Sequence, residues 1–199
     1  MTAPKDALHR VRIIGGQWKR TPLQVVDAPG LRPTPDRVRE TLFNWLGRDL
    51  STWRCLDLFA GTGALGLEAA SRGAAEVWLV EPERRVREAI AQTLRRLDAR
   101  QVRLFDEPAA RALSRARAAD LRFDLVLLDP PFGQGWLDRI LPALGPVLSD
   151  RARVYVESDA PLDSETVRRL MGPGFRLDRQ DRAGQVFYHL IVRSPAQEA

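Results

Sequence analysis

Two short segments of this chain carry residue types that could do chemistry together. One is Asp57-Leu58-Phe59-Ala60-Gly61-Thr62-Gly63, where an apolar run ends in glycines, and the other is Asp129-Pro130-Pro131-Phe132, which also follows an apolar run. Glycine lets the backbone approach a ligand without a Cβ in the way, whereas two prolines stiffen a loop that begins with an acid. We expect the first segment, the glycine loop, to hold a cofactor. We expect the second, the acceptor loop, to hold an amino group.

The glycine loop lies between a predicted strand and a predicted helix. Residues 54–59 read as a buried strand and residues 64–72 as a helix, so the first N–H groups of that helix face a ligand. The next predicted strand, 76–81, ends in Glu81, whose carboxylate can accept hydrogen bonds from both hydroxyls of a ribose. This order of strand, glycines, helix, strand and acid predicts a nucleotide-like cofactor.

Two cofactors fit that order. Gly61, Gly63 and Gly66 match the dinucleotide pattern G-x-G-x-x-G, which favours a nicotinamide-dependent oxidoreductase. Asp57 opposes that reading, because an acid just ahead of the glycines repels a pyrophosphate and suits the cationic amino-acid end of S-adenosylmethionine. S-adenosylmethionine is therefore the predicted cofactor, and NAD is the alternative.

The acceptor loop has the residues that an aromatic amine needs. Residues 123–129 read as a strand that ends at Asp129, so this acid lies at the carboxyl edge of the sheet, where open α/β folds bind ligands. The Asp129 side chain and the Pro130 carbonyl can accept hydrogen bonds from one exocyclic NH₂ and draw it towards a tetrahedral, nucleophilic nitrogen. Phe132 can stack on the base that carries the amine.

The chain resembles the class I S-adenosylmethionine-dependent methyltransferases and, more narrowly, the bacterial 16S rRNA guanine-N2 methyltransferases of the RsmD type. The resemblance covers almost the whole chain and rests on Arg12 to Trp18, Leu31 to Asn44, Asp57 to Gly66, Asp129 to Phe132 and Ala183 to Val186. It implies that the substrate is the N2 amine of one guanine in small-subunit rRNA, either free or in an assembling particle. The base must leave its stack to enter the pocket.

The resemblance also implies roles for the site residues. Asp129, Pro130 and Phe132 hold the guanine. S-adenosylmethionine lies over the glycine loop, and its contacts come from Asp57, Phe59, Ala60, Gly61, Gly63, Glu81 and Asp106. Asp106 meets the adenine amine in this reading, although the segment Asp106-Glu107-Pro108 is more acidic than the family pattern.

Positive charge is concentrated near the N-terminus. Residues 1–50 hold nine Lys and Arg against five Asp and Glu, which leaves a net charge of only +1 for the rest of a chain whose total is +5. A basic segment beside a nearly neutral domain is typical of a protein that binds a polyanion. The residues predicted to contact RNA are Arg12, Lys19, Arg20, Arg32, Thr34 and Arg37.

The remaining pattern predicts an α/β fold in three parts. Residues 1–30 form a basic N-terminal arm with strands at 10–14 and 21–25 in a hairpin, residues 31–194 form a Rossmann-like methyltransferase domain, and residues 195–199 are a tail. In the domain, Thr34 caps a helix that runs to Gly47. The sheet has seven strands, mostly parallel, and an antiparallel terminal hairpin. Further predicted strands are 101–105, 152–157, 175–182 and 185–192, and further predicted helices are 83–98, 108–118, 135–145 and 163–171.

Composition narrows the class of protein. The single cysteine, Cys55, permits no disulfide framework and favours a reducing cytoplasm. No apolar run reaches the length of a membrane span, and His9 and His189 are too few and too far apart to predict a metal site. Two alternatives remain besides the oxidoreductase: an adenine-N6 DNA methyltransferase, which uses the same acceptor loop, and a non-catalytic RNA-binding module.

Overall fold

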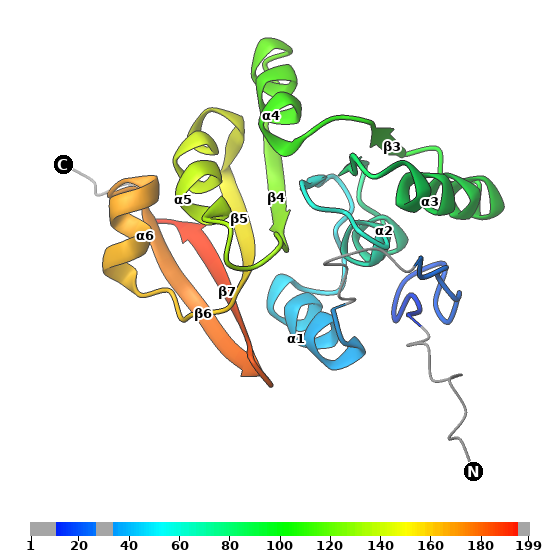
Figure 1. Ribbon diagram of the computed structural model, residues 1–199, viewed down its shortest axis with the longest axis horizontal. Helices are drawn as coiled ribbons and strands as arrows, with labels where there is room; N and C mark the ends of the chain where they lie inside the picture. The colour runs from blue at the N-terminus through cyan, green and yellow to red at the C-terminus, as the bar shows by residue number, and fades with distance from the viewer. Residues whose placement is uncertain (1–10, 27–33, 195–199) are drawn as a thin grey trace.

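A computed structural model describes residues 11–26 and 34–194 of the chain (Figure 1). Its seven-stranded sheet has the order β3-β2-β1-β4-β5-β7-β6. The first five strands in that order are parallel, and β7 is antiparallel to both β5 and β6. The strands are β1 (Arg54–Asp57), β2 (Glu76–Val80), β3 (Val102–Phe105), β4 (Phe123–Leu128), β5 (Leu148–Ser158), β6 (Phe175–Ala183) and β7 (Val186–Arg193).

Helices cover both faces of the sheet and enclose two apolar clusters. One cluster lies under α1, α2 and α3, and the other lies under α4, α5 and α6 (Figure 1). Among the described residues, no helix has both the length and the apolarity that a membrane span requires. The helices are α1 (Asp36–Leu46), α2 (Ala64–Ser71), α3 (Arg84–Leu97), α4 (Ala109–Ala118), α5 (Trp136–Ile140) and α6 (Ser164–Met171), with short 3₁₀ turns at Leu141–Ala143 and Gly145–Val147.

The predicted alternation of strands and helices is confirmed, with three local differences. The helix predicted over 135–145 is broken after Ile140, because Pro142 and Pro146 each fall within a 3₁₀ turn. Strand β5 begins four residues earlier than predicted, since an irregularity in its pairing with β4 lets the charged residues before Ala152 extend the strand. Helix α1 begins at Asp36 with Pro35 as its cap, so the predicted capping role of Thr34 is wrong.

The described part of the N-terminal arm packs on the domain. Its predicted hairpin is present in short form, with one antiparallel bridge between Arg12 and Pro22 and backbone hydrogen bonds between residues 11–13 and 20–23. The apolar side chains of this segment join the cluster under α1 and α2. A turn holds the segment against the last residue of α2: Ser71 donates to the Gly15 carbonyl at 2.6 Å, and a Cβ at Gly16 would collide with the Ser71 backbone. The predicted boundary after residue 30 lies outside the described residues.

Candidate active site

The glycine loop and the acceptor loop begin at adjacent strand ends. Asp57 is the last residue of β1, and Asp129 follows the last residue of β4. These strands are parallel neighbours, and Asp57 is paired with Leu127, two positions before Asp129. Two residues of strand span about 7 Å. The two acids that the sequence analysis selected therefore lie at one edge of the sheet, as predicted.

Asp57 holds the start of α2 and keeps one acceptor atom without a partner. Its Oδ2 accepts a hydrogen bond from the Gly66 backbone N–H at 3.1 Å, whereas its buried Oδ1 has no hydrogen-bond partner. Burial raises the pKa of Asp57 to about 7, and the Gly66 hydrogen bond only partly offsets this effect. A buried acceptor without a partner is costly in a folded protein. Oδ1 is therefore positioned to receive a cationic donor from a ligand.

Glu81 braces the glycine loop. Its Oε2 accepts from the Gly61 backbone N–H at 3.0 Å, and its Oε1 accepts from the Glu83 backbone N–H at 2.8 Å. The carboxyl is mostly buried, and burial raises its pKa. Each carboxylate oxygen can accept more than one hydrogen bond, so ribose hydroxyls can bind Glu81 without breaking these two contacts.

The glycines of this loop are needed for conformation and for packing. Gly61 and Gly63 have φ angles of +52° and +78°, which lie in the left-handed region that disfavours other residues. At Gly66 the constraint is space, because a Cβ there would collide with Leu79 and crowd Asp57. The loop with its unpartnered Asp57 oxygen therefore fits a cationic cofactor such as S-adenosylmethionine.

A buried network lies behind the acceptor loop. The Thr34 hydroxyl lies 3.2 Å from Asp129 Oδ2 and 3.0 Å from Glu157 Oε1. The Tyr155 hydroxyl donates to the same Glu157 oxygen at 2.9 Å. Thr34 and Glu157 are only 6% and 3% exposed, whereas Asp129 keeps partial exposure at the sheet edge. Asp129 can therefore contact a substrate while the residues behind it cannot.

Electrostatics at this network disfavour the ionisation of both carboxyls at once. Burial, followed by the nearby Glu157 and Asp57 carboxyls, raises the pKa of Asp129 well above its usual range. Burial also raises the pKa of Glu157, although its hydrogen bonds with Tyr155 and Thr34 oppose this shift. Three acids thus lie close together from β1, β4 and β5. Such crowding is typical of functional sites rather than of folding cores.

The other predicted site residues occupy the rim. Pro130 is buried, and Phe132 after it is half-buried. Phe59, in the glycine loop, packs edge-on against Trp136 beyond the acceptor loop, with ring centroids 5.4 Å apart. Asp106 is exposed and forms an ion pair with Arg87 at 2.8 Å. Its predicted contact with adenine stays a prediction.

Of the residues predicted to contact RNA, one is buried, four are exposed, and one lies outside the described residues. Thr34 is buried, and its hydroxyl lies against Asp129 and Glu157. Its predicted contact with RNA stays a prediction. Arg12 is exposed and paired with Asp36 at 3.0 Å. Arg37 is exposed on the first turn of α1, and Lys19 and Arg20 are exposed in the turn that packs near the end of α2. Arg32 lies outside the described residues.

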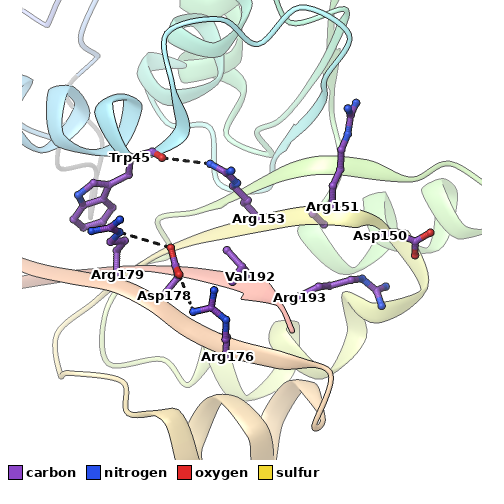
Figure 2. A pocket seen from close by; sticks show the side chains of 10 residues that line it. Trp45, Asp150, Arg151, Arg153, Arg176, Asp178, Arg179, Val192 and Arg193 are labelled. Atoms are coloured by element: carbon purple, nitrogen blue, oxygen red, sulfur yellow. Dashed lines mark hydrogen bonds and ion pairs between the residues drawn. The ribbon is translucent and has the colours of Figure 1, made fainter. Parts of the chain in front are cut away.

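A concave surface lies away from these two loops, at the opposite edge of the sheet (Figure 2). It is a groove of about 360 Å³ where β5, β6 and β7 meet the end of α1. Each of its five arginines lies within hydrogen-bond or ion-pair distance of a protein acceptor. The partners are Asp124 for Arg151, the Trp45 and Leu46 carbonyls for Arg153, Asp178 for Arg176 and Arg179, and the Ser149 and Leu148 carbonyls for Arg193.

The sequence analysis missed Glu157 and Tyr155. A signal for Glu157 was present, since it is an acid at the end of an apolar strand, as Asp57, Glu81 and Asp129 are. Four acids at the carboxyl ends of neighbouring strands of one sheet indicate one site. Tyr155 gave no such signal, because an aromatic residue in a strand is typical of a core.

Comparison with known proteins agrees with this geometry. The family model described as conserved hypothetical protein 95 matches residues 11–192. A relative named ribosomal RNA small subunit methyltransferase D, from Escherichia coli strain K12, is 42% identical over 96% of this chain and 93% of its own length. The protein of the same name from Haemophilus influenzae is 38% identical over 79% of this chain and 84% of its own length.

Solved structures give the same result. The Escherichia coli protein yhhF is 41% identical with a TM-score of 0.79, and the match covers 92% of this chain and 98% of that one. SMU.776, solved in complex with SAH, is 16% identical with a TM-score of 0.68 over 86% of this chain and 53% of that one, which shows the fold alone. Fold and site thus define a class I methyltransferase with a Rossmann-like sheet. Within that class, the chain belongs to the RsmD family.

Proposed function

We propose that this chain transfers a methyl group from S-adenosylmethionine to the exocyclic N2 amine of one guanine in 16S rRNA. The observation that carries the proposal is the meeting of two loops at one sheet edge. The unpartnered oxygen of Asp57 suits a cationic cofactor, and Asp129 suits an amine. The names of the relatives support rRNA as the substrate, and the SAH bound to SMU.776 supports the cofactor.

The cofactor site would use residues of β1, β2 and the glycine loop. Asp57 Oδ1 would hold the cationic amino-acid end, Glu81 would accept from the ribose, and Gly61 and Gly63 would let the backbone pass close by. Phe59 and Ala60 shape the loop, and Asp106 would accept from the adenine amine. When bound, S-adenosylmethionine supplies a methyl group on a sulfonium, which becomes a neutral thioether when the carbon–sulfur bond breaks.

The acceptor residues would orient the amine and remove its surplus proton. Asp129 and the Pro130 carbonyl accept hydrogen bonds from N2, and Phe132 stacks on the extruded base. As the bond between N2 and the methyl carbon forms, the amine becomes cationic and gives one proton to Asp129. Positioning supplies most of the rate in such a reaction, because the nucleophile only has to be held in line.

RNA contacts would come from the basic N-terminal part of the chain. Arg12, Lys19, Arg20, Arg32 and Arg37 are the proposed phosphate ligands. The substrate would be 16S rRNA within a small ribosomal subunit or one of its assembly intermediates, and the compartment would be the cytoplasm. The structure favours Arg37 most among these residues, because α1 begins two positions after Thr34 and hence close to Asp129.

The alternatives are less well supported. A pyrophosphate over the glycine loop would meet the Asp57 carboxyl, which already occupies the Gly66 N–H at the start of α2. A nicotinamide dinucleotide therefore fits poorly. An adenine-N6 DNA methyltransferase could use the same acceptor loop, and a non-catalytic RNA-binding module would not need one.

One experiment separates these functions. The purified chain is incubated with labelled S-adenosylmethionine and small subunits from a strain that lacks the protein, and nucleosides are then analysed by mass spectrometry. N2-methylguanosine in the 16S rRNA is the expected product. Parallel reactions contain free 16S rRNA or duplex DNA. Label in N6-methyladenine, or no label in any substrate despite binding to the RNA, would contradict the proposal.

A further inference from the structure

Four side chains form a continuous hydrogen-bonded chain behind the acceptor loop. Tyr155 contacts Glu157, Glu157 contacts Thr34, and Thr34 contacts Asp129, at 2.9, 3.0 and 3.2 Å. The members come from β5, from the segment before α1 and from the end of β4. Only the last member reaches the substrate side of the sheet edge.

The number of protons in this chain is constrained. Three hydrogen bonds need three donated protons, and the Tyr155 and Thr34 hydroxyls supply one each. The third proton has to come from a carboxyl group, on either Glu157 or Asp129. If both carboxyls were ionised, two buried anions would share the single Thr34 proton, and an anion without its own donor is costly away from water. The arrangement therefore contains one carboxylic acid.

Burial favours Glu157 as the acid. Its side chain is 3% exposed, whereas Asp129 is partly exposed, and the more buried carboxyl is the more strongly driven to its neutral form. Burial raises the pKa of both carboxyls, and the charge of Glu157 raises that of Asp129 further, so the assignment of the proton to Glu157 follows from the difference in exposure. The titratable groups facing the pair are Asp57 from β1 and Tyr155 from β5. Among the described residues, neither carboxyl forms an ion pair with Lys or Arg.

We propose that Glu157 is a positioning residue, which keeps one proton, donates it to Thr34 and thereby leaves Asp129 as the anionic acceptor of the substrate amine. This inference rests on the proposed function. In this arrangement each member donates a hydrogen bond to the next one: Tyr155 to Glu157, Glu157 to Thr34, and Thr34 to Asp129 Oδ2. The other oxygen of Asp129 stays free to accept from N2 and then to take the proton that N2 loses. Glu157 stays neutral throughout the reaction.

The first test compares two substitutions of Glu157. In Glu157→Gln, the amide nitrogen at the Oε1 position can donate one N–H to Thr34 and the other to the Tyr155 oxygen, whose own proton then turns away. We therefore expect kcat to fall by no more than about threefold, less than the effect of one hydrogen bond. Glu157→Ala removes the donor, and kcat should fall by about tenfold to a hundredfold, with little change in the affinity for S-adenosylmethionine. Equal losses of kcat in both variants would overturn the proposal.

The second test needs no turnover. A protonated carboxylic acid has a carbonyl stretching band in the infrared that shifts on deuteration. We expect the free wild-type protein at about pH 9, where Asp57 with its pKa of about 7 is ionised, to show one such band that is lost in Glu157→Gln and kept in Asp129→Asn. Loss of the band in Asp129→Asn with retention in Glu157→Gln would overturn the assignment. So would identical spectra of the wild type and Glu157→Gln.

The two tests separate this inference from the proposed function. If the wild-type chain methylates no RNA but the band assigned to Glu157 is present, the proposed function fails and the proton assignment stands. If methylation of guanine N2 is observed and the band is missing, the proposed function stands and the role of Glu157 fails. Thermal unfolding of both Glu157 variants is measured alongside, because a purely structural residue would change stability without rescue of kcat by Gln.

Discussion

The charge of Asp57 depends on its burial and on what is bound beside it. Its carboxyl is buried, one oxygen has no hydrogen-bond partner, and its pKa is about 7. A bound cation would favour the ionised form. The affinity for S-adenosylmethionine should therefore rise as the pH increases through about 7, and isothermal titration at pH values on both sides of 7 measures it. In Asp57→Asn the affinity should be lower and this pH dependence should be lost, while a dependence equal to that of the wild type would contradict the role.

The same residue makes a prediction about stability. Its folded-state pKa is raised above the value of 3.8 for a free aspartate, so the folded protein binds this proton more tightly than the unfolded chain does. This proton therefore stabilises the folded state in full below pH 3.8, and the stabilisation is lost as the pH rises to about 7. The loss lowers the free energy of unfolding by at most about 4 kcal/mol. Urea unfolding of the cofactor-free protein gives the free energy of unfolding of Asp57→Asn and of the wild type. The value for Asp57→Asn minus the value for the wild type should be larger at pH 8 than at pH 5. An equal difference at both pH values would contradict it.

Asp129 allows the sharpest test of the acceptor site. Asp129→Ala should lower methyl transfer by about 10²–10³-fold, the usual effect of removing one preorganised hydrogen-bonding group. Binding of S-adenosylmethionine should change little, because Asp129 faces the amine rather than the cofactor. Asp150→Ala, an exposed acid at the other end of β5, is the matched control. A comparable loss of cofactor binding in Asp129→Ala would remove Asp129 from the acceptor role.

At the scale of elements, the glycine loop depends on a strand other than the one it follows. Glu81 lies after β2 and accepts a hydrogen bond from Gly61. Glu81→Ala should therefore weaken S-adenosylmethionine binding by about 1.5–3 kcal/mol, the range for hydrogen bonds to a charged group. It should also speed hydrogen exchange in residues 59–63 of the free protein, because the loop loses its brace. RNA affinity is the control and should stay near that of the wild type.

The order of the elements could be predicted from the sequence because local signals determine it. Apolar runs of strand length, glycines and helical periodicity all lie within a few residues of the element that they specify. The breaks at Pro142 and Pro146 were also present as local signals that the prediction of one helix over 135–145 overlooked.

The hydrogen bonds of Thr34 show why the rest of the site could not be predicted. Its hydroxyl binds partners that lie 95 and 123 residues further along the chain. Short-range reasoning assigned Thr34 to a helix cap, because threonine before proline often has that role. Only the tertiary arrangement shows two buried carboxyls nearby, and these decide where the hydroxyl points.

At the scale of the molecule, net charge predicts binding to a polyanion but not the place of binding. The turn with Lys19 and Arg20 packs against the last residue of α2, and the glycine loop is at the first. An eight-residue helix is about 12 Å long. An RNA that contacts both Asp129 and the turn with Lys19 and Arg20 must therefore extend over at least the length of this helix. The sequence could not show this separation.

Salt dependence tests RNA binding by this turn directly. Lys19→Ala combined with Arg20→Asn should flatten the plot of log affinity against log salt by about 0.7–0.9 for each phosphate that is no longer neutralised by a side chain. Asparagine is chosen because Arg20 has a φ of +70°, which asparagine tolerates better than alanine. Turnover at saturating RNA should change little.

The matched control replaces Arg168 and Arg169 of α6 with Gln, which removes the same charge from the other face of the sheet. An unchanged slope in the Lys19 and Arg20 variant would restrict RNA recognition to α1 and the catalytic edge. An equal change in both variants would mean that net charge, rather than a particular phosphate ligand, sets the salt dependence.

The attachment of the N-terminal arm to α2 affects how the protein is digested by a protease. Arg39 and Glu68 are both fully buried, Glu68 accepts from the Ile14 backbone N–H at 2.7 Å, and Arg39 Nε donates to the Thr34 carbonyl at 3.3 Å. Removing the arm would take the Ile14 N–H from Glu68 and would expose to water the apolar surface that Val11, Ile13 and Leu23 cover, which is unfavourable. The arm therefore cannot be shed as a module. A protease that cuts within residues 11–26 should digest the whole chain instead of leaving a trimmed, stable methyltransferase core.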